Sequence, residues 1–476
     1  MKPLILCALL ALAGCATVGT DFNPPAAGSA ATFRHAAATD SARLPAQWWT
    51  VFDDATLNAL QQRALRDNPS VRASAQRLLQ AQAQLSTLRA AQGPTVNVGA
   101  SVANSRSSQL TTQSLALGGR EIAGNNYAIG ASLSYELDLW GRVKRVVEAA
   151  DAQAMVTQHE RDGVILLLSS QVAATYWQLR GMDAEMAILK QALAARGEAQ
   201  QVVEARFEGG FTNELDVVRA RVERANAEAD LHEVQRQRNL LENSLAVLVG
   251  VAPTAPLIAS LDSTTLPEPP AIPVGLPASL LAQRPDLAAS VAGLRAANAN
   301  VAMAEGAFYP SLSLTSNIGF ASESLSDIAR SGARQFSVGP LALSLPLFDG
   351  GRNKANLALS KARYAEAVAN HEGRLLTALR EVEDALSDLQ QRQRQGDVQA
   401  QSQQAAARAV LVAGARYERG LSTYLDVTDA QRSSLAADRA AAQIRTQRLL
   451  ATVAVARSLG AGWTAQAPLA TIASAR

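Results

Sequence analysis

The sequence predicts a mainly helical chain that also carries β-strands long enough to cross a membrane, built by duplication of one unit. The segment ARFEGGFTNELDV at 205–217 returns as ARYERGLSTYLDV at 415–427, which is 210 positions later. Two stretches in each half alternate apolar and polar residues, which is the period of a β-strand. Elsewhere Ala, Leu and Val dominate. The chain is 48% hydrophobic but only 4% aromatic, a composition typical of packed helices.

The first 14 residues have the pattern of an export signal. One Lys precedes an apolar run of about a dozen residues, which is too short to span a bilayer. LAGC at 12–15 resembles the lipobox of bacterial lipoproteins, which implies cleavage before Cys15 and a covalent lipid on it. The alternative is an ordinary secretory signal with an incidental cysteine. By the same resemblance, Ala16 in place of Asp implies delivery to the outer membrane. Cys7 lies in the removed segment, so no internal disulfide is expected.

The internal repeat divides the rest of the chain. Residues 141–250 align with 351–460 without a gap, and NPSV at 68 matches RPDL at 284 at a different offset. Many prolines between the halves exclude a long helix there and mark a linker. The predicted divisions are a signal peptide (1–14), a lipid-anchored segment (15–53), a first repeat (54–253), the linker (254–277), a second repeat (278–462) and a C-terminal tail (463–476).

The first half begins with a helix and two strands. Residues 69–92 predict the helix, with Asn68 as its cap and Pro69 at its first position. Alternation then predicts strands at about 94–103 and 127–138, and a length near ten residues is what a tilted transmembrane strand needs.

The second half repeats this design. Strands are predicted at about 310–319 and 336–347. The alternation of the latter slips by one residue, which predicts a β-bulge near Pro340.

Each half ends in a long helical hairpin, at about 141–249 and 351–460. Residues 141–208 contain no proline and keep apolar residues at spacings of three and four. As one helix they would extend about 100 Å, which belongs to coiled-coil architecture. A second helix, at about 214–249, returns along the first.

The repeated segment is the turn of each hairpin. Gly209 and Gly210 in the first copy and Gly420 in the second stop the long helix. Thr212 or Ser422 can cap the helix that follows.

Four strands with one apolar face cannot close into a barrel alone, because the smallest transmembrane barrels need about eight. Open edges in lipid leave backbone groups unpaired, so a symmetric oligomer is expected. Two copies would give eight strands and three would give twelve, and the pattern does not choose between them. The helices must obey the same symmetry and form a closed ring.

Composition excludes several functions. The chain has 44 basic and 42 acidic residues and no basic stretch with interleaved aromatics, so nucleic acid is not expected as a partner. The four histidines are scattered, and no HExxH, GxSxG, P-loop or dinucleotide fingerprint occurs. We predict a protein that is not an enzyme, with no catalytic residue, no metal site and no cofactor beyond the lipid on Cys15.

Several motifs occur in one order: the lipobox followed by ATVGTDFNPP, then WWTVFDD at 48–54, YELDLWGR at 135–142, QRPDL at 283–287, FYPSLSL at 308–314 and LPLFDGGR at 345–352. With the duplication and the two turns, the chain resembles the TolC-like outer-membrane factors, in particular the NodT/OprM-like lipoprotein branch of tripartite RND efflux systems.

The resemblance implies a fold and a function. The fold is a homotrimer with a twelve-stranded outer-membrane β-barrel continuous with a twelve-helix periplasmic α-barrel and a mixed equatorial region. The function is a passive conduit that exports drugs or other small molecules, with a periplasmic adaptor protein and an inner-membrane pump of RND type as partners. The conduit of a type I protein secretion system is the alternative, while a periplasmic adaptor or a structural coiled coil would lack the duplicated strands.

The two turns differ in a way that indicates a gate. Asp216 and Asp426 correspond, but three residues later Arg219 corresponds to Asp429. Asp426 and Asp429 lie one helical turn apart, and in a trimer three such pairs would form an acidic ring that favours cations. The alternative is that both only complement the positive end of the helix dipole.

The resemblance places the family's periplasmic gate here, with Tyr417 matching its gate tyrosine. An arginine found in some relatives corresponds to Ser422, so a salt bridge would use another residue, Arg416 or Arg419.

The turns are also the predicted contacts for the adaptor, with plain turn chemistry as the alternative. The membrane-facing aromatic candidates are Trp140, Tyr127 and Phe336, with core packing as the alternative. The candidate adaptor contacts are Arg206, Gly210, Leu215, Arg416, Gly420 and Leu425.

Overall fold

The structure is a computed structural model, and it describes residues 17–24, 33–35, 44–110, 112–116, 118, 121, 123–272 and 284–463. The signal peptide and Cys15 lie outside these residues. The chain forms two compact units. Of the described residues, the first unit contains 17–24 and those within 78–157 and 290–371, and the second contains the others.

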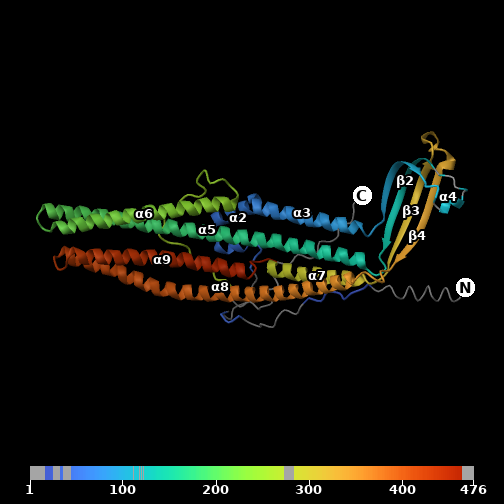
Figure 1. The fold of residues 1–476 in the computed structure, drawn as a ribbon. Coiled ribbons are helices and arrows are strands. Elements are labelled where there is room, and N and C mark those ends of the chain that lie inside the picture. Colours follow the sequence, from blue (N-terminus) through green and yellow to red (C-terminus); the bar gives the residue numbers. More distant parts are fainter. Residues whose placement is uncertain are drawn as a thin grey trace. The chain divides into compact units, whose positions relative to one another are not determined.

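The first unit contains a four-stranded antiparallel sheet in the order β1-β2-β3-β4 (Figure 1). All four predicted strands are present, but β4 ends three residues before the predicted 347. Its end is explained by Pro346, which has no N–H and restricts the residue before it. The strands are β1 (Thr95–Arg106), β2 (Ala123–Leu137), β3 (Ser311–Ser322) and β4 (Arg334–Ser344).

The register gives the sheet one apolar and one polar face. Val98, Ala131, Ile318 and Phe336 are paired in one row across the four strands. The adjacent row, on the opposite face, contains only amide and hydroxyl side chains. Its members are Asn97, Ser132, Asn317 and Ser337.

The predicted bulge is confirmed. The pairing of β3 with β4 shifts between Leu314 and Ser316, so that Gly339 and Pro340 lie opposite Thr315 alone. The extra residue restores the apolar face for the remainder of β4.

Helices form the rest of both units, and the two helices of each hairpin run side by side in Figure 1. The long first helices, α5 and α8, are both 67 residues, in agreement with the repeat. Among the residues described, no helix is long and apolar enough to cross a membrane. The helices of eight residues or more are α2 (Ala55–Asp67), α3 (Pro69–Ala90), α5 (Arg142–Glu208), α6 (Glu214–Val249), α7 (Pro285–Gly306), α8 (Arg352–Glu418) and α9 (Tyr424–Ser458).

Helix α2 was not predicted, and neither were the shorter elements. The bounds of the shorter elements are η1 (Trp48–Phe52), α4 (Thr112–Ala116), η3 (Leu325–Asp327) and η4 (Ser331–Ala333).

The turns of both hairpins have the same backbone structure. At the end of α5 the amide of Gly210 donates to the carbonyl of Phe207, and that of Phe211 donates to the carbonyl of Arg206. This is the Schellman motif, and it requires a left-handed residue, which Gly210 supplies with φ of 75°. Gly420 repeats it at the end of α8 with φ of 71°.

The predicted caps of the following helices were wrong by one residue. Asn213 caps α6, and its side chain accepts from the amide of Asp216 at 3.0 Å. Thr423 caps α9. The Schellman turn occupies one residue more than the prediction allowed, so Thr212 and Ser422 fall inside it.

Each repeat closes with the same type of hydrogen bond. Asn68 Nδ2 donates to the carbonyl of Leu248 at 2.8 Å, and its Oδ1 accepts from the amide of Ser70 at the start of α3. In the second repeat Arg284 Nη1 donates to the carbonyl of Ser458 at 3.0 Å. Leu248 and Ser458 are 210 residues apart, so the contact is part of the duplication.

The core of the second unit lies where the helices of both hairpins meet. Its largest buried side chains are Trp48, Tyr176, Trp177, Leu57, Leu179, Leu245 and Leu449.

Candidate functional site

The turns of the two hairpins pack against each other through apolar side chains. Val203, Val217 and Ala220 come from the first hairpin. They form one buried cluster with Tyr424 and Val427 of the second. The region that the sequence singled out as a gate is therefore a contact between the two repeats.

Tyr417 is held between the repeats. The guanidinium of Arg206, on α5 of the first hairpin, lies 4.8 Å from the centre of the Tyr417 ring. The ring centres of Tyr417 and Tyr424 lie 5.6 Å apart, and Tyr424 belongs to α9 of the same hairpin as Tyr417. Its hydroxyl is buried and has no hydrogen-bond partner among the described residues. Burial raises the pKa of Tyr424, with smaller contributions from Tyr417 and nearby carboxylates, so the hydroxyl of Tyr424 stays neutral.

Asp426 acts as a helix cap. Its Oδ2 accepts from the amide of Thr423 at 2.9 Å and from the Thr423 hydroxyl at 3.0 Å. Asp426 therefore stabilises the first turn of α9, as expected if its role is to complement the start of the helix rather than to form a gate. Both hydrogen bonds use Oδ2. The side chain is exposed, so Oδ1 can still accept a hydrogen bond or bind a cation.

Asp429 is 62% exposed and lies 3.8 Å from Nη1 of Arg432, three residues further along the helix. The expected partners, Arg416 and Arg419, form no ion pair in the part of the chain described. Arg416 instead approaches the carbonyl of Leu421. Within one chain, the described ion-pair partner of Asp429 is therefore Arg432 of its own helix, and the pairing of a turn arginine with the acidic ring of a trimer stays a prediction.

A buried carboxylate, which the sequence reading missed, joins the two hairpins. Glu223 of α6 is 7% exposed and lies 3.3 Å from Nη2 of Arg196 on α5. Arg432 of α9 donates to the same carboxylate from Nε at 2.8 Å. The spacing along the helix could have revealed it. Ala220, Glu223 and Ala227 share one buried face of α6, and a charged side chain on a buried face needs a partner of opposite charge.

The predicted adaptor residues lie at the outer end of both turns. Leu215 and Leu425 are 54% and 40% exposed. A Cβ added to Gly210 or Gly420 would meet nothing within 4 Å. Arg206 differs, because it is stacked on Tyr417.

The turns also present two apolar side chains that were not predicted. Phe211 is 85% and Leu421 is 65% exposed. Both follow the turn glycine directly.

The aromatic candidates of the first unit occupy different environments. Trp140 follows β2, its indole donates to the carbonyl of Pro310 at 2.8 Å, and its ring lies 5.1 Å from that of Tyr309. Phe336 is 80% exposed on the apolar face of the sheet. Tyr127 belongs to the same face, paired with Val102.

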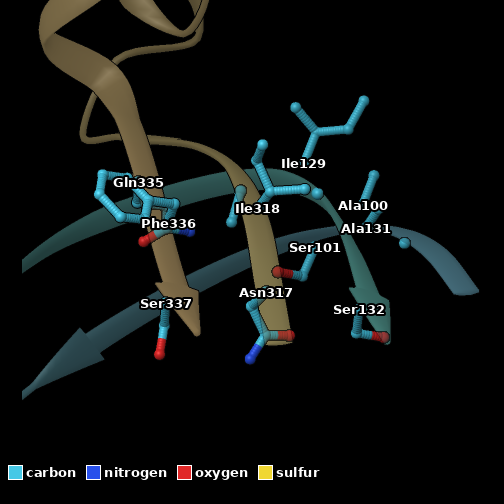
Figure 2. Close-up of a pocket in the computed structure, with 13 residues that line it drawn as sticks. Ala100, Ser101, Ile129, Ala131, Ser132, Asn317, Ile318, Gln335, Phe336 and Ser337 are labelled. Atoms are coloured by element: carbon cyan, nitrogen blue, oxygen red, sulfur yellow. The ribbon is translucent and has the colours of Figure 1, made fainter. Parts of the chain in front are cut away.

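The sheet has a hollow of about 520 Å³ (Figure 2). In Figure 2, Ile129 and Ile318 point to one side of the sheet, and Ser132, Asn317 and Ser337 point to the other. No charged side chain lines this hollow. In its central rows the polar face therefore presents amides and hydroxyls rather than charge.

A duplicated chain with two-faced strands of membrane-spanning length and two very long helical hairpins defines a class of outer-membrane channel. A family model described as outer membrane efflux protein matches residues 60–251 and 276–461. The chain belongs to this family.

Individual relatives agree. The chain is 34% identical over 462 residues to outer membrane protein OprJ of Pseudomonas aeruginosa, covering 95% of this chain and 94% of OprJ. It is 30% identical over 472 residues to cation efflux system protein CusC of Escherichia coli, covering 97% and 99%. The solved outer-membrane channel OprN matches with a TM-score of 0.87 at 31% identity, covering 94% of this chain and 100% of that one.

These likenesses confirm the resemblance, the fold class of a trimeric outer-membrane channel with a β-barrel and a helical barrel, and the outer-membrane location. They confirm an efflux channel as the function and do not favour the type I secretion conduit. The relatives are channel and efflux proteins.

Proposed function

We propose that three copies of this chain form the passive outer-membrane conduit of a tripartite pump, with a periplasmic adaptor and an inner-membrane pump of RND type. The observation that carries the proposal is the open sheet. Its order leaves β1 and β4 as unpaired edges, and one face is apolar. Pairing β4 of one copy with β1 of the next satisfies both edges and closes the sheet.

The substrates proposed are drugs or other small molecules. The polar face of the sheet supports a broad range, because its central rows carry no charge and its side chains are small. CusC is named for cation efflux, and the acidic residues at the turns of this chain are compatible with cations as well.

The native mass of the protein in mild detergent tests the assembly. Three times the chain mass is expected. A monomer under conditions that keep the helices folded would contradict the proposal, because a single copy leaves both sheet edges open.

The covalent lipid on Cys15 is also proposed. The lipobox supports it, and mass spectrometry of the mature N-terminal peptide tests it. A peptide that begins at Cys15 without added acyl mass would contradict it.

We assign the gate to Asp426, Asp429 and Tyr417. Three features of the turn region support this assignment: it is the contact between the repeats, Tyr417 lies between them, and Asp429 is exposed next to Arg432. In a trimer the carboxylates of three copies would face a common axis and hold cations there.

The double variant Asp426→Ala, Asp429→Ala should raise the ion leak of purified channels in planar bilayers. Asp384→Ala, an exposed carboxylate on α8 away from the turns, is the control and should leave conductance unchanged. Because Asp426 also caps α9, Asp429→Asn alone separates the two roles. An unchanged leak in both gate variants would remove the gate assignment.

The adaptor is proposed to contact the exposed turn residues Leu215 and Leu425 together with Gly210 and Gly420, flanked by Arg206 and Arg416. Their exposure supports this role. Leu215→Ser with Leu425→Ser should reduce dye efflux from cells while leaving the native mass unchanged. Full efflux in this variant would remove these leucines from the contact.

A further inference from the structure

The first residues that the structure describes, 17–24, form an N-terminal strap on the junction between β2 and α5. The amide of Val18 donates to the carbonyl of Trp140 at 3.0 Å. Asn298 of α7 donates from Nδ2 to the carbonyl of Thr20 at 3.0 Å. The strap is therefore bound through its backbone by two separate elements of the first unit.

Arg145 on the first turn of α5 supplies most of the remaining bonds. Its Nε donates to the carbonyl of Val18 at 3.3 Å, and its Nη2 donates to the carbonyl of Gly19 at 3.1 Å and to Oδ1 of Asp21 at 3.0 Å. Its Nη1 donates to Glu148 at 2.7 Å. Three of these four acceptors belong to the strap.

The side chain of Arg145 is only 4% exposed. A buried guanidinium is costly unless its donors are satisfied. Without the strap, only Glu148 would remain among these partners. The site is therefore built to receive a backbone segment and is not a surface on which the segment happens to lie.

Shape agrees with the hydrogen bonds. A Cβ added to Gly141 would lie 2.8 Å from the side chain of Thr17, and one added to Gly19 would lie 2.3 Å from Cβ of Ala302. Both contacts are closer than side chains tolerate, so glycine is needed once on the strap and once on its receptor.

The second repeat has no such site. At the positions 210 residues later, Gly350 replaces Trp140, Ala355 replaces Arg145 and Ala358 replaces Glu148. Arg142 of the same turn is kept as Arg352. The receptor thus appears in only one of two otherwise matching junctions, as expected of a site for the single N-terminus.

The site lies at the end of the membrane-spanning strands. Trp140, whose carbonyl binds the strap, carries the indole that bonds Pro310 and packs on Tyr309. Such aromatic pairs are typical of the membrane–water boundary. Thr17 follows Cys15 by two residues, which limits their separation to about 7 Å of extended chain.

We infer that the junction formed by Trp140, Gly141 and Arg145 is a receptor site for the N-terminal strap, and that Arg145 is a positioning residue that fixes where the lipid-bearing N-terminus enters the membrane boundary. The inference rests on the proposed acylation of Cys15 for its purpose, but the strap contacts are independent of the lipid. The anchor is then part of the folded junction and not a flexible tether.

Spin labelling tests this. Cys7 is removed with the signal and Cys15 would be acylated, so Thr20→Cys gives the trimer one free thiol per chain. The side chain of Thr20 is exposed, and the hydrogen bond from Asn298 uses only the backbone carbonyl of Thr20. The label should be immobile in the parent and in the control Lys144→Ala. In Arg145→Ala a mobile component, with a rotational correlation time at least about tenfold shorter, is expected to dominate.

Two further variants keep the inference falsifiable if Arg145→Ala does not fold. Asp21→Ala removes a side chain that is 91% exposed and should release the strap in part. Arg145→Lys keeps the charge but not the fork and should give an intermediate mobility. A label that stays immobile in all three variants, or is already mobile in the parent, would overturn the inference.

The role of the lipid is separated by Cys15→Ala, exported with an ordinary secretory signal. An immobile label in this chain supports a strap site that works without acylation. A label that is immobile only when Cys15 carries lipid would mean that the membrane holds the strap, which contradicts the role of Arg145. A parent chain without acyl mass but with an immobile label would refute only the proposed lipidation.

Discussion

The two long helices α5 and α8 have the same length and related sequences, but their environments differ. Leu168 and Val172 of α5 are buried, and so are their counterparts Ala378 and Val382 of α8. Beyond this level the helices diverge. Residues 183–189 of α5 are all buried, whereas residues 393–399 of α8 are exposed or half-buried. Duplication preserved the fold, while this part of the second copy is left exposed in the single chain.

The inter-repeat linker and the neighbouring helices α6 and α9 cover this part of α5. Arg180 of α5 donates to the carbonyl of Ala259 at 3.0 Å, and Arg238 of α6 donates to that of Ile258 at 3.1 Å. Asp183 lies between the two guanidiniums, at 2.8 Å from Arg180 and 2.7 Å from Arg238. The linker also reaches α9, where Glu268 pairs with Arg448 at 3.3 Å. In α8, the residues that correspond to Arg180 and Asp183 are Gln390 and Gln393, which offer no such charged contacts.

The largest effect is expected from Asp183→Ala. This side chain is 1% exposed, and its loss leaves two buried guanidiniums short of charge. We expect a destabilisation of about 3–5 kcal/mol. The counterpart Gln393→Ala, on the exposed face of α8, should change stability by less than about 0.5 kcal/mol. Thermal unfolding followed by circular dichroism measures both.

Equal effects of the two substitutions would contradict the comparison. Such a result would mean that residues 393–399 of α8 are packed as tightly as residues 183–189 of α5.

The next effect concerns the link between the hairpins. Glu223→Gln keeps the shape of the side chain but removes the charge shared by Arg196 and Arg432. A loss of about 2–3 kcal/mol is expected for a charged hydrogen bond of this kind. The turns should separate more easily, so single-channel recordings should show a higher leak.

Ser433→Ala is the matched control, because Ser433 corresponds to Glu223 in the second repeat and is exposed. A leak unchanged by Glu223→Gln would show that the apolar cluster alone holds the turns together.

A smaller effect is expected where each repeat closes. Asn68→Ala removes a helix cap and the bond to the carbonyl of Leu248, for about 1–2 kcal/mol. Arg284→Ala should cost at least as much, because Arg284 also pairs with Asp286 and Glu381. Urea unfolding gives both values. Ser70→Ala serves as the control, since only the amide of Ser70 takes part.

The smallest effect is a pH dependence that comes from one histidine of the first repeat, His159. Burial lowers the pKa of His159, which packs edge-on against Trp463 at 5.5 Å. As the pH falls, His159 is therefore protonated in the unfolded chain before it is protonated in the folded chain. Its contribution to the free energy of unfolding is complete above pH about 6.5, and it is lost as the pH falls from there to the lowered pKa of the folded state.

His159→Gln should flatten the decline of the thermal midpoint between pH 7 and pH 5. Its counterpart is Ala369, so the second repeat cannot contribute in the same way. An identical slope in the variant would show that other groups cause the decline.

Local patterns were sufficient to predict most of the elements. The absence of proline and the repeated glycines set the ends of α5 and α8, and alternation located the four strands and the bulge at Pro340. Stopping each helix at its turn glycine is a local rule that depends on backbone conformation alone, which is why it could be seen in the sequence.

The contacts between distant segments could not be predicted. Glu223 meets Arg432 across 209 residues, and Arg145 meets Val18 across 127. Such pairs depend on how two helices are rotated about their axes, which the apolar stripe fixes only within a residue or so. For the same reason the partner of Asp429 was expected in the turn, although Arg432 lies one turn away on its own helix.

Each repeat contains two strands and one hairpin, and a corresponding hydrogen bond, from Asn68 or from Arg284, joins the start of each repeat to the end of its hairpin. An ancestor encoding a single repeat would have needed six copies to supply the strands that three present chains supply. Gene fusion then allowed one half to evolve separately from the other. Arg145 at one junction and Ala355 at the corresponding one are an asymmetry that a single chain with two repeats can encode and a chain of one repeat cannot.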